Sequence, residues 1–213
     1  MIIKNLFFDL DGTLTDSSEG IVNCAIHALK YFNLPIPDRK QLLEFIGPPL
    51  RYTFPKYVKE SDVEKAVQVY RERYVTIGKF ENKPYDGIHE LLANLKNAGY
   101  NLYVATSKTE TQTYEILEKF DLLKYFTLVA GAMPNGARDS KASVIRYLIS
   151  QIENFDGAYM IGDTIFDIVG ANECNLPSIA VGWGFGDKTE MLNKGAEYFA
   201  ETMLDLKNYL LKE

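Results

Sequence analysis

Short apolar runs alternate with amphipathic stretches along most of this chain. Five apolar runs are bounded by glycine, proline or polar residues, at residues 2–8, 101–106, 126–130, 158–161 and 178–181. Runs of this length are typical of strands buried in a parallel sheet. Apolar positions at helical spacing predict helices at residues 87–98, 110–120, 141–152, 166–175 and 204–211. Because strand and helix alternate, we expect a doubly wound, parallel, Rossmann-like α/β sheet.

The stretch that follows the first apolar run has helical spacing only. Its apolar stripes at residues 21–32 and 63–77 recur at steps of three and four, and no strand-like run occurs before about residue 80. The sequence therefore predicts a helical domain at residues 17–82, inserted after the first strand. The α/β core would comprise residues 1–16 and 83–213, and the crossings near residues 16–18 and 82–85 would act as hinges.

Composition narrows the class of protein. The 213 residues are 46% hydrophobic and 24% charged with a formal net charge of −6, which gives no basic footprint for nucleic acid. No apolar stretch approaches the roughly 18 residues that span a membrane. Cys24 and Cys174 indicate buried thiols rather than a disulfide framework or a Cys-x-x-Cys metal site. We expect a cytoplasmic protein, monomeric or homodimeric, without nucleic-acid or membrane partners.

Two carboxylates stand at the end of the first apolar run. Asp9 and Asp11 lie two positions apart, and Gly12 follows them and lets the backbone turn sharply. Ligands of α/β sheets usually lie at such strand ends, and two carboxylates in one small volume need a cation or a shared proton to relieve their repulsion. A solvated Asp-Gly turn is the simple alternative. The full sequence Asp-Leu-Asp-Gly-Thr after a wholly apolar run favours a functional site.

A second acidic group follows the apolar run at residues 158–161. Asp163 comes directly after Gly162, and Asp167 is four positions further on, so a helix that starts after Asp163 could turn both toward one side. Asp163 could also be a simple helix cap. Together with the first two aspartates, these carboxylates predict a hard oxygen site that suits Mg²⁺ better than zinc.

Hydroxyl and cationic groups complete the pattern. Thr106, Ser107 and Lys108 end the second apolar run, where backbone N–H groups can cradle phosphate oxygens. Thr106 could instead cap the helix predicted at residues 110–120. Lys141 begins a predicted helix, where its charge opposes the helix dipole, so another interaction should favour it there. A surface lysine is the alternative.

These motifs together resemble those of the haloacid dehalogenase superfamily of phosphohydrolases. They occur in the family's order, namely Asp9 to Thr13 as the first motif, Thr106 as the second, Lys141 as the third, and Gly162 and Asp163 through Asp167 as the fourth. The helical insertion resembles the family's C1-type cap. The resemblance implies a Mg²⁺-dependent phosphatase that works through an aspartyl-phosphate.

The resemblance also implies a role for each residue. Asp9 would be the nucleophile and Asp11 the general acid and base. The Mg²⁺ ligands would be Asp9, the backbone carbonyl of Asp11, and Asp163, while Asp167 would hold water or Lys141. Charge on the phosphate oxygens would be stabilised by Thr106, the backbone amide of Ser107, and Lys141. Lys108 is a further candidate for substrate binding.

The resemblance further implies that the presence of Asp11 favours phosphate-ester hydrolysis or phosphomutase action, and that the substrate is a small phosphorylated metabolite selected by the cap. The segment at residues 45–51 resembles phosphoglycolate-phosphatase-like members, and its Arg51 would receive a second anionic or polar group of the substrate. An ordinary surface arginine is the alternative. The glycine-containing segments at residues 135–138 and 182–186 resemble that branch too and would shape the rim of the site. Alternative functions are a 5′-nucleotidase, a β-phosphoglucomutase-like phosphotransferase, or a catalytically idle binding domain.

Overall fold

The computed structural model describes residues 3–48, 50–133 and 136–211. Ile2 of the first apolar run, Pro49 of the segment at residues 45–51, and Asn135 lie outside the described residues. The chain forms two compact units. A sheet unit comprises Met1–Thr15 and Pro84–Glu213, and a helical unit comprises Asp16–Lys83.

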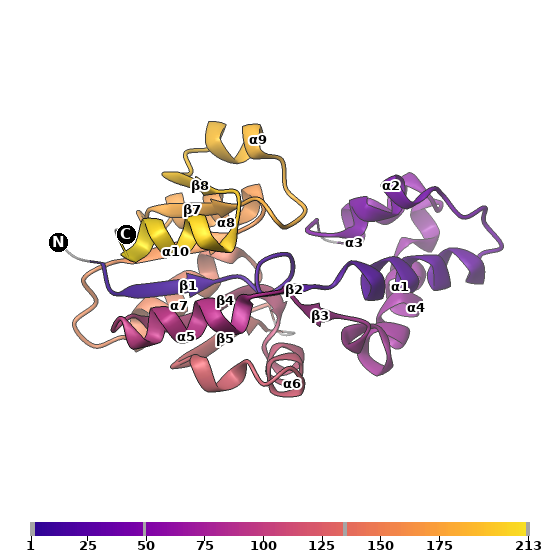
Figure 1. Ribbon diagram of the computed structural model, residues 1–213. Helices are drawn as coiled ribbons and strands as arrows, with labels where there is room; N and C mark the ends of the chain where they lie inside the picture. Colours follow the sequence, from indigo (N-terminus) through magenta and orange to yellow (C-terminus); the bar gives the residue numbers. More distant parts are fainter. Residues whose placement is uncertain (1–2, 49, 134–135, 212–213) are drawn as a thin grey trace. The chain divides into compact units, whose positions relative to one another are not determined.

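A six-stranded sheet organises the sheet unit, with strand order β5-β4-β1-β6-β7-β8 (Figure 1). All of its neighbouring strands pair in parallel. The strands are β1 (Asn5–Phe8), β4 (Asn101–Thr109), β5 (Leu128–Ala132), β6 (Ala158–Gly162), β7 (Ser178–Val181) and β8 (Tyr198–Ala200). The predicted doubly wound parallel α/β fold is therefore confirmed. The strand order reverses between β1 and β6, and the carboxyl ends at such a switch point form the ligand crevice of doubly wound folds.

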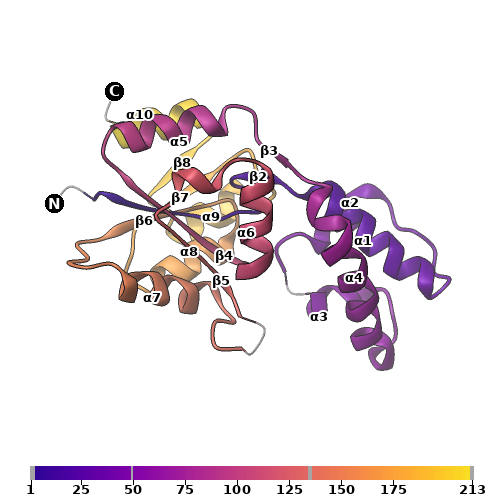
Figure 2. The same cartoon turned by 90° about the horizontal axis from the view of Figure 1, so that it is seen from below.

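Alternate side chains of the strands face two separate cores. Leu6 and Phe8 of β1 belong to one apolar cluster and Phe7 to another, as the two-residue period of a strand requires. Helices α5 (Ile88–Asn97), α6 (Glu110–Lys119) and α10 (Met203–Leu211) contribute to the first cluster. Helices α7 (Lys141–Gln151) and α8 (Ile165–Asn172) contribute to the second. Figure 2 shows α5 and α10 on one side of the strands and α7 and α8 on the other.

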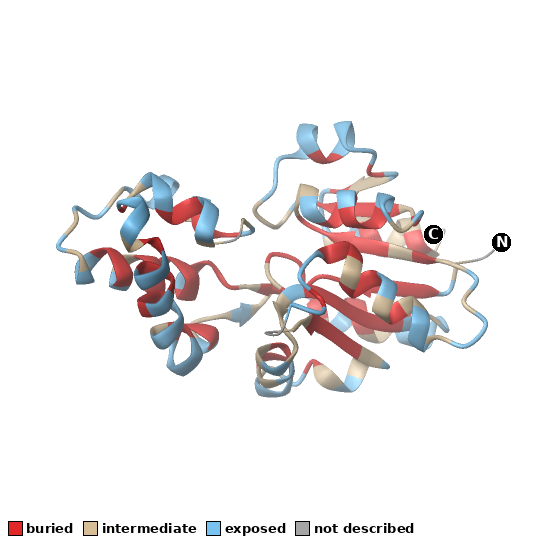
Figure 3. Ribbon diagram, turned by 180° about the vertical axis from the view of Figure 1, so that it is seen from behind, coloured by how far each residue is buried: buried red, intermediate tan, exposed pale blue. Residues whose placement is uncertain are grey.

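Burial follows from this layering. The strands are mostly buried, whereas the covering helices expose their outer faces (Figure 3). The helix boundaries lie within a few residues of those predicted, except that α8 ends at Asn172 and residues 173–175 form a turn. Asn175 has a φ of 54°, a left-handed conformation that ends this segment. Among the described residues, no helix is both long and apolar enough to cross a membrane.

The helical unit is built on two long helices, α1 (Ser18–Tyr31) and α4 (Val63–Thr76), with the short helices α2 (Arg39–Leu42) and α3 (Leu50–Thr53) between them. Its core includes an aromatic pair, Phe45 and Phe54, with ring centroids 5.0 Å apart. Gly20 of α1 lies so close to the backbone of Gly78 that a side chain at position 20 would overlap it. The absence of a side chain at position 20 therefore allows α1 to approach the segment at Gly78 this closely.

Several short elements were absent from the sequence-based prediction. They are the strands β2 (Thr15–Asp16), β3 (Lys83–Pro84) and β8, and the helices α2, α3 and α9 (Lys188–Asn193). Each has six residues or fewer, too few to establish a period. Strand β4 also runs to Thr109, past the end of its apolar run, because its pairing with β5 shifts register between Ala105 and Thr109.

Candidate active site

The carboxyl end of β1 places Asp9 at the switch point of the sheet. Its backbone N–H donates to the carbonyl oxygen of Ile161 on β6 at 2.9 Å, which extends the pairing of the two strands. The Asp9 side chain is largely buried, and its Oδ1 lies 2.9 Å from Lys141 Nζ. The first acidic residue therefore lies inside the site rather than in a solvated turn.

Lys141, the first residue of α7, is buried and not a surface lysine. Its Nζ lies 2.7 Å from Asp167 Oδ1 and donates to the carbonyl oxygen of Ala105 at 3.0 Å. Burial alone would lower the pKa of Lys141, but the charges of Asp167 and Asp9 outweigh it and raise the pKa above its ordinary value. These carboxylates explain why a positive charge is stable at this helix start.

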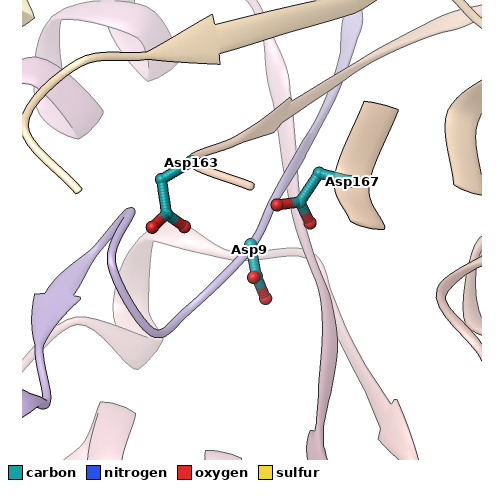
Figure 4. A group of neighbouring side chains, drawn as sticks. All are labelled: Asp9, Asp163 and Asp167. Atoms are coloured by element: carbon teal, nitrogen blue, oxygen red, sulfur yellow. The ribbon is translucent and has the colours of Figure 1, made fainter. Parts of the chain in front are cut away.

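Asp163 and Asp167 complete an acidic cluster with Asp9, hereafter the acidic cluster. One carboxylate oxygen of each residue lies within 4.8 Å of the others (Figure 4). Asp163 directly follows β6, and Asp167 is in the first turn of α8. The helix is capped by Thr164, with which Asp167 forms a capping box, so Asp163 is not its cap.

The acidic cluster carries an excess of negative charge. Burial and then the charges of Asp167 and Asp9 raise the pKa of Asp163 well above its ordinary value. Burial also raises the pKa of Asp167, although Lys141 opposes this effect. Carboxylates that repel one another in a buried space are suited to a cation, and carboxylate oxygens are hard ligands that Mg²⁺ prefers. The residues present therefore fit a hard divalent cation.

The remaining predicted residues of the sheet unit lie at the end of β4 and after β1. Lys108 Nζ lies 2.8 Å from Asp11 Oδ2, and the Lys108 side chain is only 7% exposed. Thr106 is buried, and its Oγ1 accepts a hydrogen bond from the Lys108 backbone N–H at 3.2 Å. Thr109, not Thr106, is the residue before α6. Ser107 is exposed.

Arg51 belongs to the helical unit and lies on α3. Its Nε and Nη2 donate to Glu64 at 2.6 and 2.9 Å, and both side chains are more than half exposed. In the structure its guanidinium is therefore engaged by an acidic residue of the same unit. Its role as a substrate contact stays a prediction.

Three further residues form contacts at the site. Thr13 belongs to the first motif and Trp183 and Phe185 to the segment expected at the rim, but no individual role was predicted for them. Thr13 Oγ1 donates to Asp163 Oδ1 at 3.2 Å, and the Phe185 backbone N–H donates to Asp163 Oδ2 at 2.9 Å. Trp183 Nε1 donates to the Thr13 carbonyl oxygen at 3.0 Å. The sequence signal for this loop was its alternating glycines, because a Cβ at position 184 would overlap Asp163.

A second unpredicted feature is an ion pair between the segment before α7 and the first residue of α6. Arg138 Nη2 lies 2.7 Å from Glu110 Oε2, with the Arg138 side chain 10% exposed. The guanidinium also lies over the ring of Tyr147 at 4.1 Å. The pair joins the segment before Lys141 to the first residue of α6, and so it steadies the start of α7.

Several proteins from other organisms are similar to this chain in sequence. The chain is 38% identical over 182 residues to the tyrosine-protein kinase PtkA of Mycobacterium tuberculosis, an alignment that covers 85% of this chain and only 62% of that protein. It is 37% identical to a 5′-nucleotidase of Pseudomonas aeruginosa, over 97% of this chain and 95% of that protein. It is 31% identical to a phosphoglycolate phosphatase of Agrobacterium fabrum, over 84% and 81% respectively.

A solved structure and a family model also match this chain. The crystal structure of a predicted phosphatase from Clostridium acetobutylicum matches with a TM-score of 0.91 and 40% identity, over the whole of both chains. Residues 6–181 match the family described as haloacid dehalogenase-like hydrolase. The chain therefore belongs to the haloacid dehalogenase-like hydrolase family.

Proposed function

We propose that this protein is a Mg²⁺-dependent phosphomonoester hydrolase that acts on a small phosphorylated metabolite through an aspartyl-phosphate on Asp9. One observation carries the proposal. The Asp9 carboxylate stands at the end of β1, 2.9 Å from the Lys141 ammonium and beside the carboxylates of Asp163 and Asp167. The proposed nucleophile, an opposite charge and carboxylates that could hold a cation thus lie together at the switch point of the sheet.

The reaction would proceed in two displacements at phosphorus. An Asp9 oxygen attacks phosphorus, the ester P–O bond breaks, and Asp11 donates a proton to the leaving alkoxide oxygen. Asp11 then accepts a proton from a water molecule that attacks the phosphorus of the aspartyl-phosphate. The P–O bond to Asp9 breaks, inorganic phosphate leaves, and the Asp9 carboxylate is restored.

The acidic cluster would hold the cation. Asp9, Asp163 and the backbone carbonyl of Asp11 would be its ligands, and Asp167 would orient Lys141 and bound water. When bound, Mg²⁺ would offset the negative charge that builds up on the phosphoryl oxygens. Four carboxylates, including Asp11, face only two ammonium groups here, so an anionic substrate needs this added positive charge.

The phosphate oxygens would be bound at the end of β4. The Thr106 hydroxyl, the Ser107 backbone N–H and the Lys141 ammonium are the proposed donors. Lys108 would also contact the phosphate. The Lys108 ammonium is paired with Asp11, the proposed proton donor. A bound phosphate and Asp11 would therefore share this ammonium group.

We also propose that residues 17–82 form a mobile cap on the catalytic core of residues 1–16 and 83–213. Such caps select substrates by contacts that close over the site. Arg51, from the segment that resembles phosphoglycolate phosphatases, would contribute a charged contact. To do so it would have to exchange its pairing with Glu64 for one with the substrate.

Two substrate classes are supported by different observations. Phosphoglycolate-like carboxylated phosphates are supported by the segment that contains Arg51 and by the Agrobacterium relative. Nucleoside 5′-monophosphates are supported by the Pseudomonas relative, which matches nearly the full length of both chains.

A substrate panel tests the proposal. Release of inorganic phosphate from phosphoglycolate, nucleoside 5′-monophosphates and hexose phosphates would be measured with Mg²⁺ and with a chelator. We expect Mg²⁺-dependent release from one class. Transfer of phosphate between sugar positions without release would indicate a mutase. If no substrate in the panel reacted, the proposed hydrolase would be wrong and an idle binding domain would be favoured.

A further inference from the structure

The loop after β7 holds the single tryptophan of the chain. Residues 182–186 read Gly-Trp-Gly-Phe-Gly and connect β7 to α9; we call them the tryptophan loop. Trp183 Nε1 donates to the carbonyl oxygen of Thr13 at 3.0 Å, across 170 positions of sequence. The proposed reaction makes no use of this indole.

The two segments that the indole joins each supply one donor to Asp163. The Thr13 hydroxyl donates to Oδ1 at 3.2 Å, and the Phe185 backbone N–H donates to Oδ2 at 2.9 Å. Each of the two carboxylate oxygens therefore accepts a hydrogen bond, and the two donors come from different segments. The distance between the two segments therefore determines the orientation of the Asp163 carboxylate, and with it the direction of the lone pairs that are left for a cation.

The same segments enclose Asp163 at backbone contact. A Cβ at Gly12 or at Gly184 would overlap the Asp163 side chain, and one at Gly186 would overlap its carbonyl oxygen. Gly12 also has a φ of 81°, which favours glycine on its own account. Because the enclosure is so close, a small displacement of either segment would turn the carboxylate.

We propose that Trp183 is a positioning residue for the cation site. Its indole N–H ties the tryptophan loop to the turn at Thr13, and this tie keeps both donors on Asp163. The inference rests on the proposed function, since it takes Asp163 to be a Mg²⁺ ligand. Residues that orient metal ligands typically change metal affinity by roughly 10–100-fold when they are altered.

The same geometry makes Trp183 an optical reporter. The indole donates a hydrogen bond to Thr13, and Thr13 donates one to Asp163. Trp183 is the single tryptophan of the sequence, so it alone gives the tryptophan emission. A Mg²⁺ ion held by Asp163 would change the charge and the hydrogen bonding around this side chain. We therefore expect a saturable change of tryptophan emission when Mg²⁺ is added to the substrate-free protein.

Three variants and a matched control test the inference. Trp183→Phe keeps an aromatic ring in the loop and removes the N–H donor. Thr13→Val removes the hydroxyl that Asp163 accepts, keeps the tryptophan, and is paired with Thr13→Ser, which restores the hydroxyl. Tyr100→Phe is the control. It also removes one side-chain hydrogen bond to a backbone carbonyl, that of Leu210 at 2.6 Å. Tyr100 precedes β4 and so lies at the amino ends of the strands, opposite the edge that carries the acidic cluster.

Mg²⁺ affinity would be measured by calorimetry on each full-length protein, together with its melting temperature. We expect Trp183→Phe to weaken Mg²⁺ binding about tenfold and Tyr100→Phe to leave it unchanged. Thr13→Val should reduce the emission change, and Thr13→Ser should recover it. Equal Mg²⁺ affinity in wild type and Trp183→Phe, or no emission change in a wild type that binds Mg²⁺, would overturn the positioning role alone. No Mg²⁺ binding to the wild type would overturn both this role and the proposed function.

Discussion

At the scale of single residues, Lys141 shows how one buried charge organises its surroundings. Its ammonium contacts Asp9, which directly follows β1, Asp167 of α8, and the carbonyl oxygen of Ala105 in β4. An ammonium this well buried is stable only because opposite charges surround it. It thereby connects three elements of the sheet unit and holds the Asp9 carboxylate at the end of its strand.

The nucleophile assignment predicts the effect of one isosteric change. Asp9→Asn keeps the shape of the side chain but removes the attacking carboxylate, so turnover should fall by at least about 10³-fold. Folding should persist, because Lys141 keeps its contacts with Asp167 and Ala105 and one repelling charge is lost from the acidic cluster. Phosphate release and the melting temperature are the measurements.

Asp121→Asn is the control for this prediction. Asp121 is exposed, pairs with Lys124 at the surface and has a φ of 54° that asparagine also tolerates. It undergoes the same chemical change away from the acidic cluster, so activity should be retained. An Asp9→Asn protein with near wild-type turnover would remove Asp9 from the mechanism.

At the scale of elements, parallel strands determine what the sequence alone can indicate. Asp9 and Asp163 are 154 positions apart, yet both follow apolar runs, and carboxyl ends of neighbouring parallel strands meet at one edge. The fold and the gathering of Asp9, Asp163 and Asp167 follow from that rule. These residues could be placed at the same edge without knowing which strands are neighbours, because the carboxyl ends of all strands in a parallel sheet lie at one edge.

Contacts between loops could not be predicted in this way. The bond from Trp183 to Thr13 depends on the path of two glycine-containing segments, and local sequence sets no distance between them. The pairing of Arg51 with Glu64 likewise depends on how α3 and α4 pack. Strand β8 was missed because three residues carry no readable alternation.

The helical unit contains an ion pair whose effect depends on pH. Arg73 donates to Glu81 at 2.6 and 2.8 Å, and Asn23 of α1 donates to the same carboxylate at 3.1 Å. The hydrogen bonds from Arg73 lower the pKa of Glu81 from its ordinary 4.5. Because the pKa is lower in the folded state, the pair stabilises the fold above about pH 4.5, and this stabilisation is lost as pH falls through the folded-state pKa.

We expect Glu81→Gln to lower the free energy of unfolding of the helical unit by about 1–3 kcal/mol at pH 7. The difference from wild type should shrink toward pH 3, where Glu81 becomes protonated in both states. Urea unfolding followed by far-ultraviolet circular dichroism measures it, and emission of Trp183 reports the sheet unit separately, since that residue lies in the other unit.

Glu64→Gln is the matched control. It removes a second Arg–Glu pair of the helical unit, that of Arg51 and Glu64, whose side chains are 61% and 70% exposed against 18% and 24% for Arg73 and Glu81. Solvent screens the exposed pair, so its loss should have a smaller effect with little dependence on pH. Equal effects of the two changes would show that burial does not decide the strength of these pairs.

At the scale of the whole molecule, the chain leaves the sheet unit and returns to it at one place. Leu14, just before the helical unit, accepts a hydrogen bond from the backbone N–H of Tyr85, just after it, at 3.2 Å. The sheet unit is thus interrupted by 68 residues of sequence, Asp16–Lys83, but its two ends are held together by its own backbone.

This closure predicts that the helical unit can be deleted. If residues 16–83 are replaced by a short glycine-serine linker, the sheet unit should still fold, because the ends already lie at hydrogen-bond distance. It should hydrolyse p-nitrophenyl phosphate in the presence of Mg²⁺ and lose discrimination among natural substrates. Circular dichroism, tryptophan emission and the substrate panel are the measurements, and a deletion protein that failed to fold would show that the sheet unit depends on the insertion.

The paired ends at Leu14 and Tyr85 also bear on how such a protein changes over evolutionary time. An insertion whose two junctions coincide can be exchanged between relatives by recombination, as a cassette, while the strands that carry the aspartates keep their register. Under the proposed division into cap and catalytic core, selection could act on substrate preference and on bond cleavage as separate traits. Grafting the corresponding segment of a relative between these two junctions should then change substrate preference while the proposed catalytic residues of the sheet unit keep their places.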